Sequence, residues 1–197
     1  MKEIFKNVKK FSKEEFVKKQ EIFKKLEKGQ SPHTFFIGCS DSRIVPNLFT
    51  SSDPGELFVV RNIANIVPPF DENNATYKCT ASALEYAVLY LEVENIIVCG
   101  HSDCGGLKAL RYPKEELQKL PNVIKWLSLV KNKLDLNKSK EEIEKENIIL
   151  QIKNLLTYPF VKEKVKEGKL NIYGWYYIFE EGKVYNYNYQ TMEFELI

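Results

Sequence analysis

Short apolar runs of strand length alternate with a helix-like stretch in the first half of this chain. The runs cover residues 34–39, 57–61 and 95–99 and are rich in β-branched and aromatic side chains. Residues 76–91, before the third run, place apolar side chains at helical spacing. Strands that alternate with helices are typical of an α/β fold, so we expect a mainly parallel sheet of buried strands, flanked by helices and joined by right-handed crossovers.

Two chemically reactive motifs follow two of these runs. Cys39 and Asp41 come at the end of the first run, and His101 and Cys104 come directly after the third. Parallel α/β sheets bind ligands beyond the carboxyl ends of their strands, so both motifs belong to the ligand-binding edge. Thiols, imidazole and carboxylate are zinc ligands, and three of them with one open position are typical of a catalytic site. The sequence therefore predicts a catalytic zinc site.

The composition limits the range of partners and compartments. Lys and Arg total 29 against 27 acidic residues, and this balance excludes a strong field for nucleic acid or a membrane surface. The chain contains no apolar run of 18 residues, which a membrane span would need. Four cysteines are too few for a disulfide scaffold, so we expect a cytoplasmic protein. Cys79 and Cys99 are interpreted as small buried hydrophobes.

The ends of the chain predict two accessory elements around one domain that spans residues 1–197. Residues 1–28 show helical spacing with ten lysines and five acids, which predicts an N-terminal helical arm. The arm has no tryptophan, so we expect it to pack against this subunit or a neighbour and not against a membrane. Residues 170–179 and 183–189 alternate aromatic and polar side chains, which predicts an antiparallel hairpin at the sheet edge.

Two further helices are expected in the second half, over residues 121–133 and 140–156. A charged run with five basic and five acidic residues, 131–147, links them. Such a run is typical of a solvated helical face, and we expect it to face water.

Taken together, these motifs resemble the β-class carbonic anhydrases, which interconvert carbon dioxide and bicarbonate. The matching segments, which extend over most of the chain from Gly29 onward, are residues 39–43, 54–56, 58–65, 85–87, 100–106 and 155–160. The resemblance implies one zinc per chain, held by Cys39, His101 and Cys104. It also implies an obligate dimer, assembled further in some members, with active sites at the subunit interface.

The resemblance further gives Asp41 and Arg43 the roles of a neighbouring acid and base pair. Zinc makes a bound water acidic enough to supply hydroxide near neutral pH, and this hydroxide attacks the carbon of carbon dioxide. We expect Asp41 to accept a hydrogen bond from the hydroxide. A bidentate clamp by Arg43 would keep the Asp41 carboxylate off the metal. In some members the counterpart of Asp41 binds zinc in a closed, inactive form.

The substrate-pocket positions of the family correspond here to one amide, three large side chains and one glycine: Gln30, Phe58, Ile63, Tyr86 and Gly105. Phe58 and Ile63 also suit a plain hydrophobic core, and this alternative stays open. Gln30 favours the plant-like, open-site subgroup. The other subgroup has a tryptophan three residues before the first zinc cysteine and uses it in a regulatory bicarbonate site, whereas this chain has Phe36. The proton carrier is undecided among His33, Tyr86, Asp41 and buffer.

Two other functions are compatible with the same residues. A related zinc hydrolase on this fold, acting for example on carbon disulfide, would keep every zinc ligand and differ in its pocket. A non-catalytic zinc-binding regulatory module would need neither an open coordination position nor the pair Asp41 and Arg43. Assays of both substrates, with zinc measured alongside, separate these alternatives.

Overall fold

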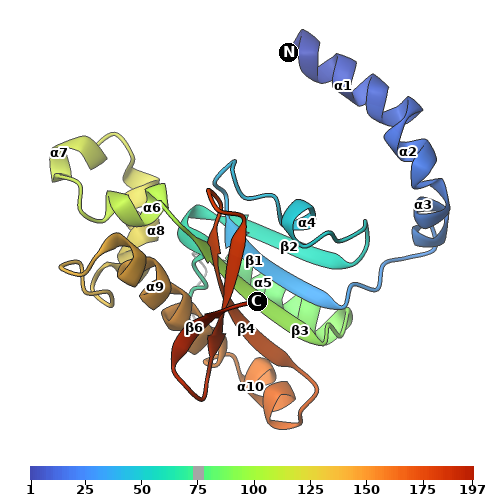
Figure 1. Ribbon diagram of the computed structural model, residues 1–197. Coiled ribbons are helices and arrows are strands. Elements are labelled where there is room, and N and C mark those ends of the chain that lie inside the picture. The colour runs from blue at the N-terminus through green and yellow to red at the C-terminus, as the bar shows by residue number, and fades with distance from the viewer. Residues whose placement is uncertain (73–77) are drawn as a thin grey trace.

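The computed structural model describes residues 1–72 and 78–197 and is built around one six-stranded sheet (Figure 1). Its strands are β1 (Thr34–Cys39), β2 (Leu57–Asn62), β3 (Asn95–His101), β4 (Asn171–Ile178), β5 (Lys183–Asn188) and β6 (Glu193–Leu196). They lie in the order β2-β1-β3-β4-β5-β6. Strands β1 to β4 run parallel to one another, and β5 and β6 extend the sheet as antiparallel strands. The predicted α/β fold with a mainly parallel sheet is confirmed.

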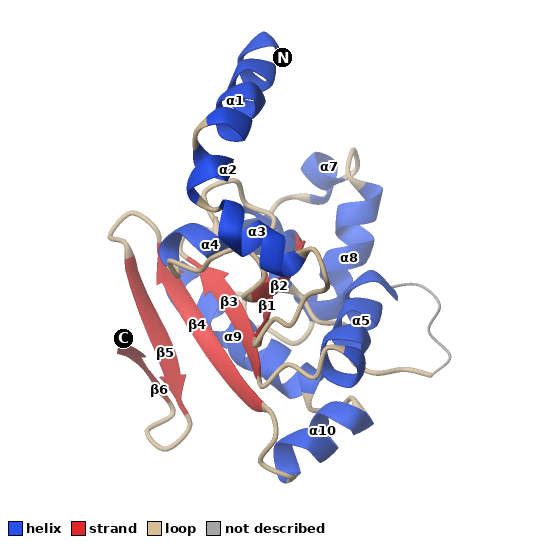
Figure 2. Cartoon of the chain, turned by 90° about the vertical axis from the view of Figure 1, so that its right-hand side faces the viewer, coloured by secondary structure: helices blue, strands red, loops and turns tan. Residues whose placement is uncertain are grey.

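Helices pack against both faces of the sheet, and the helices at the N-terminus of the chain project beyond it (Figure 2). They are α1 (Lys2–Lys13), α2 (Glu15–Lys18), α3 (Gln20–Leu26), α4 (Pro46–Phe49), the 3₁₀ turn η1 (Ile63–Asn65), α5 (Lys78–Glu85), the π-helix η2 (Tyr86–Tyr90), α6 (Gly105–Ala109), α7 (Lys114–Leu117), α8 (Pro121–Lys131), α9 (Lys140–Leu155) and α10 (Pro159–Lys166). Among the described residues, no helix is both long and apolar enough to cross a membrane.

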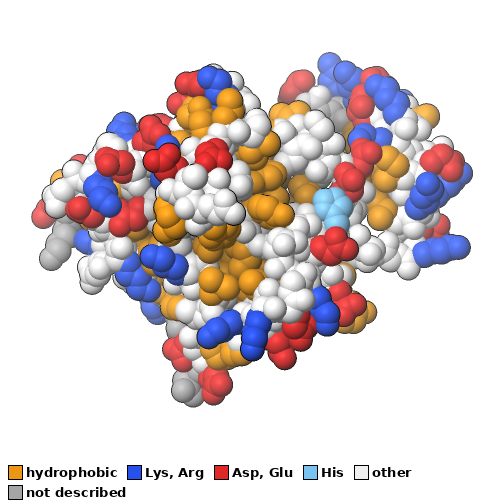
Figure 3. Space-filling view, turned by 60° about the horizontal axis from the view of Figure 1, so that its bottom comes forward, with side chains coloured by type: hydrophobic (Ala, Val, Ile, Leu, Met, Phe, Trp, Pro, Cys, Tyr) orange, Lys and Arg blue, Asp and Glu red, His pale blue; other side chains and the backbone are white. Residues whose placement is uncertain are grey.

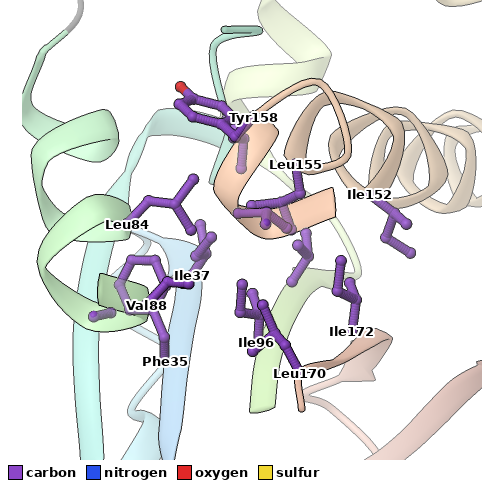
Figure 4. Close-up of a cluster of buried hydrophobic side chains, with 14 of the residues drawn as sticks. Phe35, Ile37, Leu84, Val88, Ile96, Ile152, Leu155, Tyr158, Leu170 and Ile172 are labelled. Atoms are coloured by element: carbon purple, nitrogen blue, oxygen red, sulfur yellow. The ribbon is translucent and has the colours of Figure 1, made fainter. Parts of the chain in front are cut away.

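The main core lies on one face of the sheet, under α5, η2, α9 and α10. Phe35 and Ile37 of β1 point into it, because alternate residues of a strand face the same side. Side chains of the covering helices, such as Leu84 and Leu155, close over them (Figure 4). The opposite face carries a smaller cluster around Phe36 and α4. Helices therefore cover the two faces to different extents.

Helix α9 approaches the sheet unusually closely. A Cβ atom placed on Gly100 of β3 would lie 2.7 Å from Ile148 of α9, and one on Gly174 of β4 would lie 2.9 Å from the same residue. A side chain at either position would force Ile148 to move from its place against the sheet. Because Cys104 follows β3 after a short turn, this close packing sets α9 directly behind the second reactive motif.

Several expectations about local structure need correction. The strand β2 is not buried: it is an edge strand with β1 as its one neighbour, and Val59 is 39% exposed. The expected helix over 76–91 is α5 followed by the π-helix η2, while positions 76 and 77 lie outside the described residues. Cys79 is exposed, whereas Cys99 is buried as expected. The antiparallel extension has a further strand, β6, beyond the predicted hairpin.

The N-terminal arm is helical as expected, in three segments, and projects away from the sheet (Figures 1 and 2). None of the residues in these segments is buried. Its large apolar side chains are exposed instead, among them Phe5, Val8 and Phe11. Lys19 forms an ion pair with Asp53 at the base of the arm. Within one chain, the apolar face of α1 is therefore uncovered.

Candidate metal centre

Three side chains with metal-binding atoms meet at the carboxyl edge of the sheet. Cys39 is the last residue of β1, His101 is the last residue of the adjacent β3, and Cys104 precedes α6. One ligand atom from each lies within 4.8 Å of the other two. The sulfurs of Cys39 and Cys104 are 4.0 Å apart, and all three residues are buried. The sheet thus brings together residues 62 positions apart because neighbouring parallel strands end at the same edge.

The histidine presents one free nitrogen to this cluster. His101 Nδ1 lies 2.8 Å from the carbonyl oxygen of Ser102, so the neutral ring donates its Nδ1–H there and carries a lone pair on Nε2. Nε2 is buried and has no hydrogen-bond partner among the described residues. An orphaned buried acceptor of this kind is costly unless a cation or donor occupies the adjacent space. Its hydrogen-bonded Nδ1 is also the usual arrangement for a metal-binding histidine.

The geometry and chemistry of the three residues fit zinc. Two Zn–S bonds of about 2.3 Å at a tetrahedral angle place the sulfurs about 3.8 Å apart, close to the spacing found here. The Cys104 thiol, whose sulfur lies 4.0 Å away, lowers the pKa of Cys39, and positive charge on the nearby His101 acts in the same direction. Burial opposes the charged imidazolium, but the negative charge of a Cys39 thiolate raises the pKa of His101. A soft, divalent cation stabilises such thiolates.

A clamped carboxylate lies beside the cluster. Arg43 donates from Nε and Nη2 to the two carboxylate oxygens of Asp41, at 2.8 and 2.7 Å. These hydrogen bonds hold the pKa of Asp41 well below its usual range. Arg61 fixes the same loop by donating to the carbonyl oxygens of Cys39 and Asp41, at 2.8 and 2.6 Å. Asp41 is therefore an oriented anion two residues from a metal ligand.

Comparisons with known proteins agree with this chemistry. A family model described as carbonic anhydrase matches residues 34–184. The chain belongs to the carbonic anhydrase family. A carbonic anhydrase of Helicobacter pylori (strain J99) is 39% identical over 203 residues, covering 95% of this chain and 90% of that protein.

Solved β-carbonic anhydrases share the fold. The β-carbonic anhydrase CcaA has a TM-score of 0.92 and 38% identity, covering all of this chain and 99% of that one. A tetrameric β-carbonic anhydrase from the ascomycete Sordaria macrospora has a TM-score of 0.72 and 31% identity, covering 93% and 94%. This carbonic anhydrase is therefore of the β class, whose cofactor is zinc, and its Cys39, His101 and Cys104 form a group that could hold the ion.

The predicted pocket residues of this carbonic anhydrase fall into two groups. Ile63 and Gly105 adjoin the metal centre, because Gly105 follows Cys104 and a Cβ on Gly106 would lie 2.7 Å from Ile63. The other three lie toward the amino end of the sheet. Phe58 pairs with Phe35, four residues before Cys39 and so about 13 Å along the strand from it.

Tyr86 and Gln30 belong to the same distant group. The ring of Tyr86 lies 5.7 Å from that of Phe58, and Gln30 precedes the first residue of β1. One chain therefore does not bring Gln30, Phe58 and Tyr86 to its own metal centre. The plain core interpretation suits Phe58, which is half-buried and packs against the main core, but not Ile63, which is 38% exposed.

Glu144 is a residue of the site that the sequence did not predict. It lies in the charged run that was expected to face water, yet it is only 3% exposed. One carboxylate oxygen accepts a hydrogen bond from the backbone N–H of Cys104 at 2.9 Å, and the other accepts from the hydroxyl of Tyr176 at 2.8 Å. Burial raises the pKa of Glu144. The available signal was its position four residues before Ile148, on the apolar face of α9.

Proposed function

We propose that this protein catalyses the reversible hydration of carbon dioxide to bicarbonate and a proton. The observation that carries the proposal is the buried Cys39-His101-Cys104 group, with ligand atoms within 4.8 Å of one another beside a clamped carboxylate. Zinc, when bound, supplies the Lewis acidity that lets water ionise near neutral pH. A regulatory zinc module would need no such carboxylate, so the pair Asp41 and Arg43 favours catalysis.

Three residues around the metal centre have separate roles in this proposal. Asp41 is charged and held in one orientation, so it can accept a hydrogen bond from the attacking water and fix the direction of its lone pair. Arg43 keeps that carboxylate from approaching the cysteines and histidine. Ile63 offers an apolar wall, which suits an uncharged substrate such as carbon dioxide.

We infer that the complete pocket is shared between two copies of the chain. Gln30, Phe58 and Tyr86 lie far from the metal centre of their own chain, and the exposed side chains of Leu89 and Tyr90 continue their surface. Hydrophobic side chains gather in a band across the middle of one face (Figure 3). Such surface is typical of an interface between subunits. Self-association also suits the exposed apolar face of the N-terminal arm and the tetrameric relative.

The open-site subgroup is the form that we propose for this enzyme. Phe36 is fully buried, its ring lies 6.0 Å from that of Phe49, and its side chain has no hydrogen-bond donor for an anion. Asp41 is paired with Arg43, as an open site requires. We further propose that the enzyme works in the cytoplasm, where a reducing environment keeps Cys39 and Cys104 available as thiolates.

Stopped-flow measurement of carbon dioxide hydration on the purified protein, with zinc content measured in parallel, tests the proposed function. We expect zinc-dependent hydration well above the uncatalysed rate. Zinc-loaded protein that hydrates no carbon dioxide but hydrolyses carbon disulfide would indicate the related hydrolase. Zinc-loaded protein inactive on both would indicate the regulatory module.

A further inference from the structure

A stripe of four polar side chains runs along the buried face of α9. Its members follow one another at spacings of three, four and three residues, which places them on one side of the helix: Glu144, Asn147, Gln151 and Asn154. All four are at most 5% exposed. Burying polar groups is unfavourable unless each finds partners, so the stripe needs partners outside its own helix.

Three of the four bind the backbone of the segment that follows β2. Asn147 Nδ2 donates to the carbonyl oxygen of Ala64 at 3.0 Å. Gln151 Oε1 accepts from the N–H of Val67 at 2.9 Å, and Asn154 Nδ2 donates to the carbonyl oxygen of the same residue at 2.8 Å. Gln151 also donates to Asn147 Oδ1 at 2.8 Å, so the amides form one connected network.

The segment that these amides hold is strained and adjoins the metal centre. Ala64 and Asn65 have φ values of 62° and 47°, in the left-handed region that side chains other than glycine rarely adopt. A Cβ on Gly106 would meet Ile63 at 2.7 Å and Ala64 at 3.1 Å, so the turn packs directly against the start of α6, which follows Cys104. Strained backbone of this kind persists only where its surroundings fix it.

The fourth member of the stripe holds the metal loop itself. Glu144 accepts the N–H of Cys104 and is fixed in turn by the hydroxyl of Tyr176. The helix cannot easily shift, because Ile148 fills the space left by Gly100 and Gly174. Both loops of the site are therefore attached to the same rigid helix face.

We propose that the buried polar stripe of α9 is a positioning device for the active site. Glu144 sets Cys104 for zinc, while Asn147 and Gln151 set the turn that presents Ile63 to the substrate. The inference rests on the proposed carbon dioxide hydration. Positioned supporting groups commonly change metal affinity or activity by 10–100-fold in other enzymes, although they touch neither metal nor substrate.

The test uses two variants with separable readouts. Glu144→Gln should speed zinc loss to a chelator about tenfold, because the Cys104 loop loses a charged acceptor. Asn147→Leu, which keeps the branching of the side chain and removes its hydrogen-bonding atoms, should raise KM for carbon dioxide about 3- to 10-fold through the lost hydrogen bond, with zinc loss unchanged. Gln151→Met is a second variant of the same turn with the same expectation, should Asn147→Leu fail to fold.

Leu155→Val is the matched control, since it removes one methylene from a buried core residue of the same helix that has no part in holding either segment. It should lower Tm and leave both zinc loss and KM unchanged. The proposal is overturned if the polar variants also change only Tm. Absence of hydration in the wild-type protein would refute the proposed function instead, and the zinc-loss comparison for Glu144→Gln would still decide whether the stripe positions the metal loop.

Discussion

Arg43 holds both carboxylate oxygens of Asp41, from Nε at 2.8 Å and from Nη2 at 2.7 Å. The guanidinium is itself fixed, because Nη2 also donates to the carbonyl oxygen of Asp103 at 3.1 Å and the group lies 4.2 Å from the centre of the Phe179 ring. This arrangement makes Asp41 an anion of fixed position beside a metal ligand.

Removing the clamp should therefore separate zinc binding from catalysis. In Arg43→Ala the Asp41 carboxylate is free to turn toward the metal centre, so we expect full zinc content and hydration reduced at least about tenfold. Arg43→Lys keeps the charge but loses the bidentate geometry, and should fall between the two. Stopped-flow rates and metal analysis on the same samples check this. Wild-type turnover in Arg43→Ala would show that the clamp has no such role.

Activity should follow one gradual titration as the pH changes. A carboxylate with a lowered pKa stabilises the fold above its unfolded value of about 3.9 and loses that contribution only as the pH falls through the folded value. Asp41 therefore stays charged from about pH 5 to 9, and in the open-site form that we propose, Phe36 offers bicarbonate no hydrogen-bond donor. We expect kcat/KM to rise smoothly from about pH 7 toward 9, with or without bicarbonate, as water ionises on a metal with two thiolate ligands. A steep, cooperative loss below about pH 8 that bicarbonate deepens would place the enzyme in the other subgroup.

A shared pocket makes a clear prediction for mixed assemblies. Gln30→Ala and Asp41→Asn damage different parts of the site, so each variant alone should be impaired. If the partner supplies Gln30, half of the dimers reassembled from an equal mixture contain one intact site, and activity should recover to about a quarter of the wild-type value. Activity that stays at the mean of the two separate variants would show that each chain uses its own Gln30.

The N-terminal arm should contribute to self-association. Replacing Phe5, Val8 and Phe11 together by serine removes exposed apolar surface while leaving the sheet and the metal centre unchanged. We expect a smaller assembly by light scattering at equal protein concentration. Lys6→Ser and Lys9→Ser on the same helix serve as a matched control. An unchanged mass in the apolar variant would exclude the arm as an interface.

The sheet and the metal ligands were predictable because their signals are local. Apolar runs mark β1 and β3, and the residue types at and just beyond their carboxyl ends identify Cys39, His101 and Cys104. The edge position of β2 was not predictable, because an apolar run has the same sequence pattern in a central strand and in an edge strand.

Glu144 shows why other parts of the site escaped prediction. Its neighbours in sequence are charged, but its hydrogen-bond partners, Cys104 and Tyr176, are 40 and 32 residues away. The left-handed conformations of Ala64 and Asn65 likewise depend on amides from α9 and not on glycine. Long-range partners of this kind override local patterns, and the only local sign of Glu144 was its helical spacing from Ile148.

Zinc content and carbon dioxide hydration, measured together on wild-type protein and on Cys39→Ser, His101→Ala and Cys104→Ser, test the central claim most directly. The account predicts one zinc per chain in the wild type and loss of both zinc and hydration in each variant, because catalytic zinc is typically held by three protein ligands and each variant removes one. Stripping zinc from the wild type should abolish hydration, and adding zinc back should restore it. Full zinc occupancy in all three variants, or hydration that persists without zinc, would contradict the account.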